Sequence, residues 1–271
     1  MDLLKRHLAP ILPEAWAQID DEARRVLKLA LAGRKVVDFD GPHGWEHAAL
    51  NVGRLVLHEK ELVEGVRVGT RVVQPLIEIR APFTLDVLEI DSVGRGAKEL
   101  DLEPVVEVSE RVARAEDDAI FNGSSEAGIR GIIESSPHPP VELPIDPAGY
   151  PRAIVEALEV LREAAVAGPY GLVLGPRWYK QVSEASEDGY PIRKRIERQI
   201  IDGPLVWASS VEGAVLLSLR GGDFTLTVGQ DLSIGYAAHD REKVELYLTE
   251  SFTFRVHDGA AAVYLKPPLV V

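Results

Sequence analysis

Between residues 51 and 80 the chain follows a period-two pattern, which limits the fold more than any other feature of the sequence. Successive side chains of a strand point to opposite faces, so such alternation predicts paired β-strands. The pattern alternates Val66, Val68 and Val72 with Arg67, Gly69 and Arg71, and Glu59-Lys60-Glu61 falls in the turn region of a long hairpin. An isolated hairpin is marginally stable in water, and no obvious third strand lies nearby in the sequence. We therefore expect an extended arm that packs on a neighbouring subunit.

Two stretches have the periodicity of amphipathic helices. The first follows Pro13, and Gly33 stands where a C-terminal cap is expected. Its apolar positions are Trp16, Ile19, Ala23, Val26, Leu27, Ala30 and Leu31. The second covers residues 105–121 and ends before Asn122-Gly123, with Val108, Val112, Ala115 and Phe121 on its apolar face. Both segments are predicted to be helices that bury one face.

A proline-rich stretch between residues 135 and 151 marks a linker or crossing point into an inserted α/β unit. Its prolines are Pro137, Pro139, Pro140, Pro144 and Pro147. The segments that follow predict a helix at 154–165, a strand at 171–174, helices at 178–187 and 192–201, and a strand at 205–208. Beyond these the chain is rich in strands, and the clearest alternation is Val244, Leu246, Leu248, Phe252, Phe254 and Val256. Together these patterns indicate a mixed α+β protein with an arm.

Several short segments carry a family resemblance. Arg220-Gly221-Gly222-Asp223-Phe224, followed by Gly229-Gln230-Asp231-Leu232-Ser233-Ile234-Gly235-Tyr236, resembles the signature of encapsulins, the shell proteins of bacterial nanocompartments. Four more segments fit family 1 encapsulins in the same order: Gly33-Arg34-Lys35-Val36-Val37-Asp38 with Gly41-Pro42 and Gly44-Trp45-Glu46, Pro82-Phe83-Thr84-Leu85-Asp86, Gly168-Pro169-Tyr170, and Glu250-Ser251-Phe252-Thr253-Phe254. None of them is a catalytic motif, so their number, order and spacing carry the resemblance.

The resemblance implies the fold of tailed-phage major capsid proteins, with a peripheral domain, an axial domain and an extended hairpin loop. We divide the chain accordingly into five segments. These are 1–48 (N-terminal helix and start of the peripheral domain), 49–80 (extended hairpin loop), 81–136 (peripheral helix and strands), 137–219 (axial α/β domain) and 220–271 (C-terminal strands of the peripheral domain). The periodicity supports the mixed class and the arm, whereas the capsid fold rests on the resemblance.

The resemblance also implies the function. Encapsulin subunits self-assemble into a closed icosahedral cage, here expected to be of the smallest class, and carry no reaction of their own. The cage encloses a cargo enzyme, commonly a ferritin-like iron-storage protein or a dye-decolourising peroxidase that acts in oxidative stress. A short targeting peptide at the C-terminus of the cargo binds the inner wall.

The residues that match the family's peptide site lie on two segments. They are Leu31, Arg34 and Asp38 near the N-terminal helix, and Asp231, Leu232, Ile234 and Tyr236 in the signature. Apolar members could form a groove for aliphatic side chains, while the charged members pair with polar groups of the peptide and fix its register. In the alternative, Arg34 forms an internal salt bridge with an aspartate and the apolar residues are core. On this basis, Arg34→Glu or Ile234→Asp is predicted to abolish cargo capture without affecting assembly.

A second site follows from the loop that matches the family's fivefold vertex, Ser183 to Tyr190. Its candidate pore residues are Glu184, Glu187, Asp188 and Gly189. Symmetry would repeat the acidic side chains around a narrow opening, which favours entry of cations. The alternative is an exposed polar loop without a role in transport.

Cofactor and metal sites have weak support in the sequence. Some encapsulins carry flavin near the segment that matches residues 83–91, but Val87 and Leu88 offer no aromatic platform for the ring, so no cofactor is expected. His43 and His47 have i,i+4 spacing but lie among glycines and a proline, so no metal is expected there either. The run Glu116-Asp117-Asp118 could hold a cation, but a helical run of carboxylates is more often a solvated face, and we interpret it as one.

The composition of the chain limits the classes of partner that it can bind. The net charge of −13 argues against nucleic acid, since phosphate binding needs a basic surface. The basic run Arg193, Lys194, Arg195 and Arg198 is expected to be a solvated or intersubunit face. No stretch resembles a membrane span, and the chain has no cysteine, so a cytoplasmic protein is expected. Besides the encapsulin, we consider a prophage capsid subunit and, from another class, a hydrolase or flavin-dependent enzyme; no nucleophile motif supports an enzyme.

Overall fold

The long strand β15 (Lys243–Val256) forms the centre of the first of two five-stranded sheets in the computed structural model, which describes residues 3–187 and 190–268. One edge of β15 pairs antiparallel with β4 (Ile77–Asp86), and the other pairs with β14 (Ser233–His239) and β13 (Phe224–Val228). The short strand β1 (Asp38–Asp40) then joins β13 in parallel. The apolar alternation in β15 puts Val244, Leu246 and Leu248 in the core, which confirms the predicted strand.

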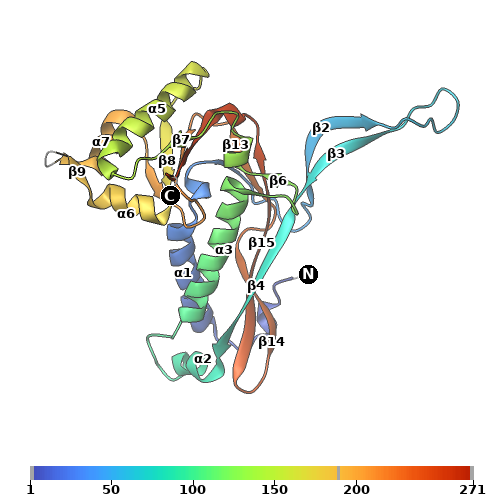
Figure 1. Ribbon diagram of the computed structural model, residues 1–271. Coiled ribbons are helices and arrows are strands. Elements are labelled where there is room, and N and C mark those ends of the chain that lie inside the picture. The colour runs from blue at the N-terminus through green and yellow to red at the C-terminus, as the bar shows by residue number, and fades with distance from the viewer. Residues whose placement is uncertain (1–2, 188–189, 269–271) are drawn as a thin grey trace.

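Helices α1 (Pro13–Ala30) and α3 (Glu103–Phe121) lie beside each other and pack with the strands of this sheet around one apolar core (Figure 1). Both predicted helices are confirmed, with two corrections. Ala115 is exposed, because the buried face of α3 runs through Val108, Val112, Ala113, Glu116 and Ile120 instead. The helix α1 already ends at Ala30, so Gly33 is not its cap. Gly33 lies in the short turn η2 (Gly33–Lys35), where a Cβ atom would overlap the Ile120 side chain.

The arm consists of β2 (Ala49–Leu57) and β3 (Gly69–Pro75), which form a two-stranded antiparallel sheet. It projects away from the rest of the molecule (Figure 1). No third strand of the described residues pairs with it. The chain leaves β3 at Pro75 and enters β4 at Ile77, so the hairpin is confirmed and its second strand leads directly into the first sheet.

The second sheet has the order β11-β8-β12-β16-β7. Its strands are β7 (Val141–Glu142), β8 (Tyr170–Leu174), β11 (Leu205–Trp207), β12 (Ala214–Ser218) and β16 (Ala262–Lys266). The same unit contains α5 (Tyr150–Glu163), α6 (Pro176–Glu184), α7 (Ile192–Arg195) and a π-helical turn, η4 (Ile196–Ile200). The predicted order of helices and strands in this unit is confirmed, although residues 186–187, which we expected to be helical, form strand β9.

One strand lies where the sequence did not place it. The sequence assigns the whole segment 220–271 to the peripheral domain. Its strand β16 instead pairs with β12 and β7 in the second sheet, whose other strands all lie within the axial segment 137–219. Pairing between such distant segments leaves no local pattern in the sequence. The other segment boundaries stay predictions.

The remaining elements are short. They are η1 (Arg6–Leu8), α2 (Val87–Gly94), β5 (Gly123–Ser124), β6 (Ile129–Arg130), α4 (Ile132–Ser135), η3 (Pro147–Gly149), β9 (Ser186–Glu187), β10 (Tyr190–Pro191) and η5 (Gly259–Ala261). The β9–β10 hairpin projects from the α5–α7 unit, on the side of the molecule opposite the arm (Figure 1).

Candidate functional site

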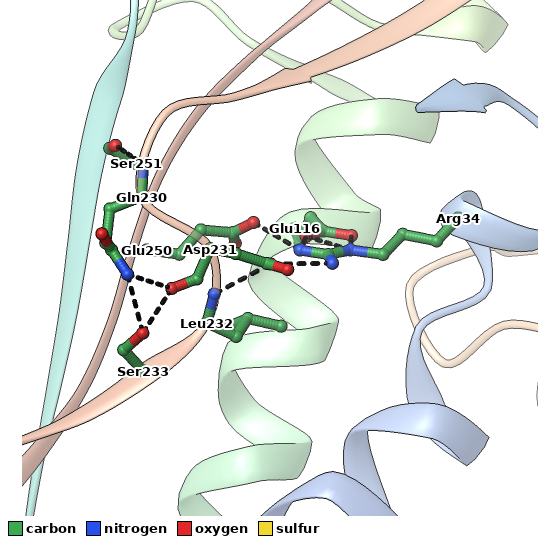
Figure 2. Close-up of polar contacts among 8 residues, drawn as sticks. All are labelled: Arg34, Glu116, Gln230, Asp231, Leu232, Ser233, Glu250 and Ser251. Atoms are coloured by element: carbon green, nitrogen blue, oxygen red, sulfur yellow. Dashed lines mark hydrogen bonds and ion pairs between the residues drawn. The ribbon is translucent and has the colours of Figure 1, made fainter. Parts of the chain in front are cut away.

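A cluster of charged side chains lies where the chain turns after α1. Leu31 follows the helix with its amide bonded to the Leu27 carbonyl oxygen at 3.0 Å, and η2 then carries Arg34. The guanidinium points toward α3 and the loop before β14 (Figure 2). Its side chain is only 17% exposed, and a cation with so little water around it needs carboxylate partners.

Helix α3 supplies two fully buried carboxylates. Glu116 accepts hydrogen bonds from Arg34 Nε at 3.1 and 2.9 Å and from Nη2 at 2.7 Å. Asp117 accepts from the backbone amides of Ala32 at 3.0 Å and Gly33 at 2.7 Å. The interpretation of this run as a solvated face is therefore wrong for both residues. They lie on the side of α3 that the turn after α1 covers.

Strand β15 and the loop before β14 supply the other partners of Arg34. Glu250, which is fully buried, accepts from Nη2 at 2.5 Å, and Asp231 accepts from Nη1 at 2.9 Å. Glu250 Oε2 has no hydrogen-bond partner among the described residues. Three carboxylates thus share one guanidinium.

Two carboxyl groups of this region have altered acidity. Burial and the charge of Glu116 raise the pKa of Glu250 well above its ordinary value. Burial raises the pKa of Asp117 to about 7, although the amide hydrogen bonds from Gly33 and Ala32 act in the opposite direction. Both groups therefore tend to keep a proton at a pH where exposed carboxyl groups have lost theirs.

The turn from Gln230 to Ser233 is held by hydrogen bonds on both sides (Figure 2). Gln230 N donates to Ser251 Oγ at 2.8 Å, and Ser251 N donates to the Gln230 carbonyl oxygen at 2.9 Å. Within the turn, Leu232 N donates to Asp231 Oδ1 at 2.9 Å and Ser233 Oγ donates to the Asp231 carbonyl oxygen at 2.7 Å. The position of Leu232 is therefore tied both to β15 and to the charged cluster.

The residues predicted to bind cargo fall into three groups. Leu31 and Ile234 are buried in the apolar core that α1 and α3 form with the first sheet. Arg34 forms salt bridges inside the chain. For these three residues the alternative interpretation of the site describes the structure. Leu232 and Tyr236 pack against that core but are half-buried, so part of each side chain faces outward. The structure thus brings six of the seven residues into one region, and their role in binding cargo stays a prediction.

Asp38 has partners of its own. Its Oδ2 accepts from the Gly222 amide at 2.6 Å, and it lines a separate pocket of about 160 Å³ together with Lys35 and Asp223. This bond joins the turn after α1 to the segment that precedes β13. Asp38 therefore links two parts of the family signature.

The candidate pore residues lie at the end of α6 and in the β9–β10 hairpin. Glu184 is the last residue of α6 and is exposed, with its carboxylate 3.9 Å from Lys180 Nζ. Glu187 belongs to β9, whereas Asp188 and Gly189 lie outside the described residues. The β9–β10 hairpin, which contains Glu187, lies at one extremity of the molecule (Figure 1).

The structure also describes the two segments that we considered for a flavin and for a metal ion. Val87 and Leu88 begin α2, where Leu88 is 70% exposed. His43 Nε2 lies 2.9 Å from Asp40 Oδ1, and its ring centroid is 4.7 Å from that of His47. Within residues 3–187 and 190–268, no group of three or more acidic or histidine side chains is arranged to hold a metal ion. The structure also has no helix in this part of the chain that is long and apolar enough to cross a membrane.

Sequence reasoning missed Glu116 and Glu250 as members of the site, although both carried a signal. Glu250 is an inward-facing position of the period-two pattern of β15, between Leu248 and Phe252. Glu116 lies four residues after Val112 on the apolar face of α3. A charged residue at a position reserved for the core needs a buried partner, and Arg34 is that partner.

Solved structures with little sequence similarity share this architecture. The virus-like particle from Pyrococcus furiosus matches 93% of this chain and 100% of its own, with a TM-score of 0.68 at 16% identity. The capsid of Myoviridae phage XM1 matches 87% of this chain and 90% of its own, with a TM-score of 0.56 at 9% identity. The chain therefore has the tailed-phage capsid fold, which confirms the expected fold class.

Comparison of sequences then identifies the family. A family model described as an encapsulating protein for peroxidase matches residues 1–253. The type 1 encapsulin shell protein of Rhodospirillum rubrum is 48% identical, over 98% of this chain and 97% of the relative, and that of Rhodococcus erythropolis is 47% identical, over 98% and 100%. The chain belongs to the family of type 1 encapsulin shell proteins. It is a structural subunit of a nanocompartment, which is favoured over a prophage capsid.

Proposed function

We propose that copies of this chain form a closed icosahedral cage of the smallest class that holds a cargo enzyme, which they bind through its C-terminal targeting peptide. In this proposal the shell performs no reaction and carries no cofactor, and it works in the cytoplasm. Neither nucleic acid nor a membrane is a partner.

The arm is the observation that carries this proposal. Its two strands have no third strand among the described residues, yet the strands and the segment that connects them expose many large apolar side chains. These are Leu55, Val56, Leu57, Leu62, Val63, Val66 and Val73. A two-stranded sheet with so much apolar surface is not stable alone in water, and an exposed patch of this kind marks an interface between proteins. The neighbouring subunits of the cage would cover it.

A peroxidase is the first candidate for the cargo, because the family model is described as encapsulating one. A ferritin-like iron-storage protein is the second candidate, from the resemblance of the sequence. For the peptide we propose the face that exposes Leu232 and Tyr236, above Leu31 and Ile234. The half-buried leucine and tyrosine offer apolar contacts to a short peptide, while the paired Arg34 and Asp231 hold the surface in shape.

For the vertex we propose that the acidic segment lines a pore. Glu184 is exposed and, with Glu187, Asp188 and Gly189, would surround a fivefold opening. The repeated negative charge would favour cations such as iron and slow anions. This property would suit a ferritin-like cargo more than a peroxidase.

Electron microscopy of the chain expressed alone and purified by size exclusion tests the assembly. We expect uniform hollow cages. A monomer or small oligomer would contradict the proposal and reopen the enzyme alternative. Co-expression with the product of a neighbouring gene, with and without its last residues, then tests the cargo: loss of co-purification on truncation is the expected result.

A further inference from the structure

We propose that Glu116 and Glu250 are positioning residues: through Arg34 and Asp231 they hold the turn from Gln230 to Ser233 in the shape that receives cargo, and a proton on Glu250 is part of that arrangement. The inference builds on the proposed docking of a cargo peptide at Leu232. It gives the buried acids a role in presenting the docking surface.

The first step concerns the donors of Arg34. A guanidinium has five N–H groups in a fixed planar arrangement. Its Nε and Nη2 atoms bond to Glu116, Nη2 bonds also to Glu250, and Nη1 bonds to Asp231. At most one N–H group, on Nη1, is then left for a peptide. Arg34 is therefore better suited to hold its own chain in place than to read the register of a partner.

The second step leads from the cluster to the turn. Asp231 Oδ1 receives both Arg34 Nη1 and the amide of Leu232, each at 2.9 Å. One carboxylate oxygen thus connects the guanidinium to the backbone of the residue that faces outward. If Arg34 shifts, Asp231 shifts with it, and the amide of Leu232 loses its acceptor.

The third step is the charge balance. The charged groups around the cluster are Arg34 and Lys35 from the turn after α1, Glu116 and Asp117 from α3, Asp231 from the loop before β14, and Glu250 from β15. Lys35 is exposed and donates to the Leu29 carbonyl oxygen at 2.8 Å, so Arg34 alone faces three carboxylates. Two of these are fully buried, and a buried charge without compensation is costly.

A proton on Glu250 resolves this imbalance. Its Oε2 is buried without a partner among the described residues, and burial beside Glu116 raises the pKa of the group. When rising pH removes the proton, the cluster gains a second buried negative charge next to Glu116. Glu116 and Glu250 cannot leave their helix and strand, whereas Asp231 is 38% exposed and can turn to water. Alkaline pH should therefore release Asp231 and loosen the turn.

Hydrogen–deuterium exchange of assembled shells without cargo tests whether alkaline pH loosens the turn from Gln230 to Ser233. The measured quantity is the protection factor of residues 230–234, corrected for the chemical exchange rate at each pH. For the wild-type shell we expect protection to fall about tenfold as pH rises from the acidic to the alkaline end of the range in which the cages stay intact. In Glu250→Gln, which stays neutral, protection should change little over the same range. Wild-type shells with equal protection at both ends of this range, or a variant with the wild-type slope, would overturn the inference.

Asp258→Asn is the matched control, because Asp258 also pairs with an arginine, Arg220, at 2.9 Å in a cluster on the other side of β13. It should keep the wild-type pH slope at residues 230–234. If Glu250→Gln does not form cages, infrared spectra of shells that carry Asp117→Asn replace it, because Asp117 also has a raised pKa and would contribute a second band. The band of the remaining protonated buried carboxyl group should disappear as pH rises, in step with the loss of protection; a band that stays unchanged while protection falls would overturn the inference.

A synthetic peptide with the last residues of the neighbouring-gene product used in the co-expression experiment separates this inference from the docking proposal. Binding to wild-type shells at the acidic end of that range that weakens about tenfold at the alkaline end, but not in Glu250→Gln, supports both. Absence of binding at any pH would refute docking at this face, while the exchange experiment still decides the role of Glu250.

Discussion

Arg34 is the residue on which the apolar core around α1 and α3 and the turn before β14 depend, because it pairs with Glu116 and Glu250, two acidic side chains that have no access to water. Removing one partner of a buried ion pair leaves the other charge uncompensated, which is more harmful than the loss of a surface salt bridge. The expectation that Arg34→Glu leaves assembly intact must therefore be revised. A third buried acid beside Glu116 and Glu250 would oppose folding itself.

We predict that Arg34→Leu lowers the free energy of unfolding by about 3–5 kcal/mol, because the buried Glu116 loses its cation and the buried Glu250 loses its hydrogen-bond donor. Thermal unfolding of purified subunits, together with electron microscopy of the assemblies, measures the effect. Arg24→Leu is a suitable comparison, since Arg24 pairs with the exposed Asp21 and its loss should cost less. Normal cages with an unchanged melting temperature in Arg34→Leu would contradict the buried cluster.

Leu232 and Ile234 should respond differently to a negative charge. Ile234 is buried at 3% exposure, so Ile234→Asp should impair folding, contrary to the first expectation for this variant. Leu232 is half-buried at the surface, so Leu232→Asp should leave cages intact and reduce cargo capture at least tenfold if the peptide loses an apolar contact of about 1.5 kcal/mol or more. The ratio of cargo to shell in purified cages measures capture, with Ala238→Asp on the exposed end of β14 as the control. Equal loading in Leu232→Asp would place the docking surface elsewhere.

At the scale of elements, the sequence predicted the parts whose signal is local. The 3.6-residue periodicity of α1 and α3 and the alternation in β15 were sufficient, because each of these elements buries one continuous apolar face. The partners of the strands were not predictable. The parallel pairing of β1 with β13 and the return of β16 to the second sheet join segments far apart in the chain. The site was predicted in part: the family resemblance found Arg34 and Asp231, but Glu116 and Glu250 needed the three-dimensional arrangement.

The arm should be required for assembly and dispensable for the fold of the subunit. We predict that Leu55→Glu with Leu57→Glu gives monomers or small oligomers in place of cages, since charged side chains would have to be buried at the interface. Light scattering after size exclusion gives the mass, and circular dichroism reports whether the fold is kept. Val155→Glu, at an exposed apolar position of α5, is the control and should form cages. Cages of normal size from the double variant would show that the arm does not hold the shell together.

For the whole molecule, the raised pKa values set the dependence of stability on pH. The pKa of Asp117 is about 7 in the folded chain against an ordinary value of 3.8, and that of Glu250 is also raised, so the folded chain binds more protons than the unfolded chain between these values. Stability from these groups is full below their ordinary pKa and declines as pH rises through the folded value. We predict a lower melting temperature at about pH 8 than at about pH 5.5.

Differential scanning calorimetry of assembled shells over this pH range measures how the melting temperature changes with pH. Asp117→Asn and Glu250→Gln should each make this change smaller, because neither side chain titrates. A melting temperature that rises steadily from the acidic to the alkaline end would contradict the protonation assigned to the two groups.

Strand β16 lies near the C-terminal end of the chain and is therefore synthesised late. Strand β7 has β16 as its neighbour in the second sheet, and β16 is among the last elements in chain order. During translation β7, β8 and β11 leave the ribosome well before β16, so the sheet that supports α5 to α7 stays incomplete for most of synthesis. The residues of the arm, by contrast, emerge early and lie close together in the sequence. A nascent chain therefore exposes the apolar residues of the arm before the second sheet is complete. Contact between neighbouring nascent chains on one messenger RNA would begin from these residues.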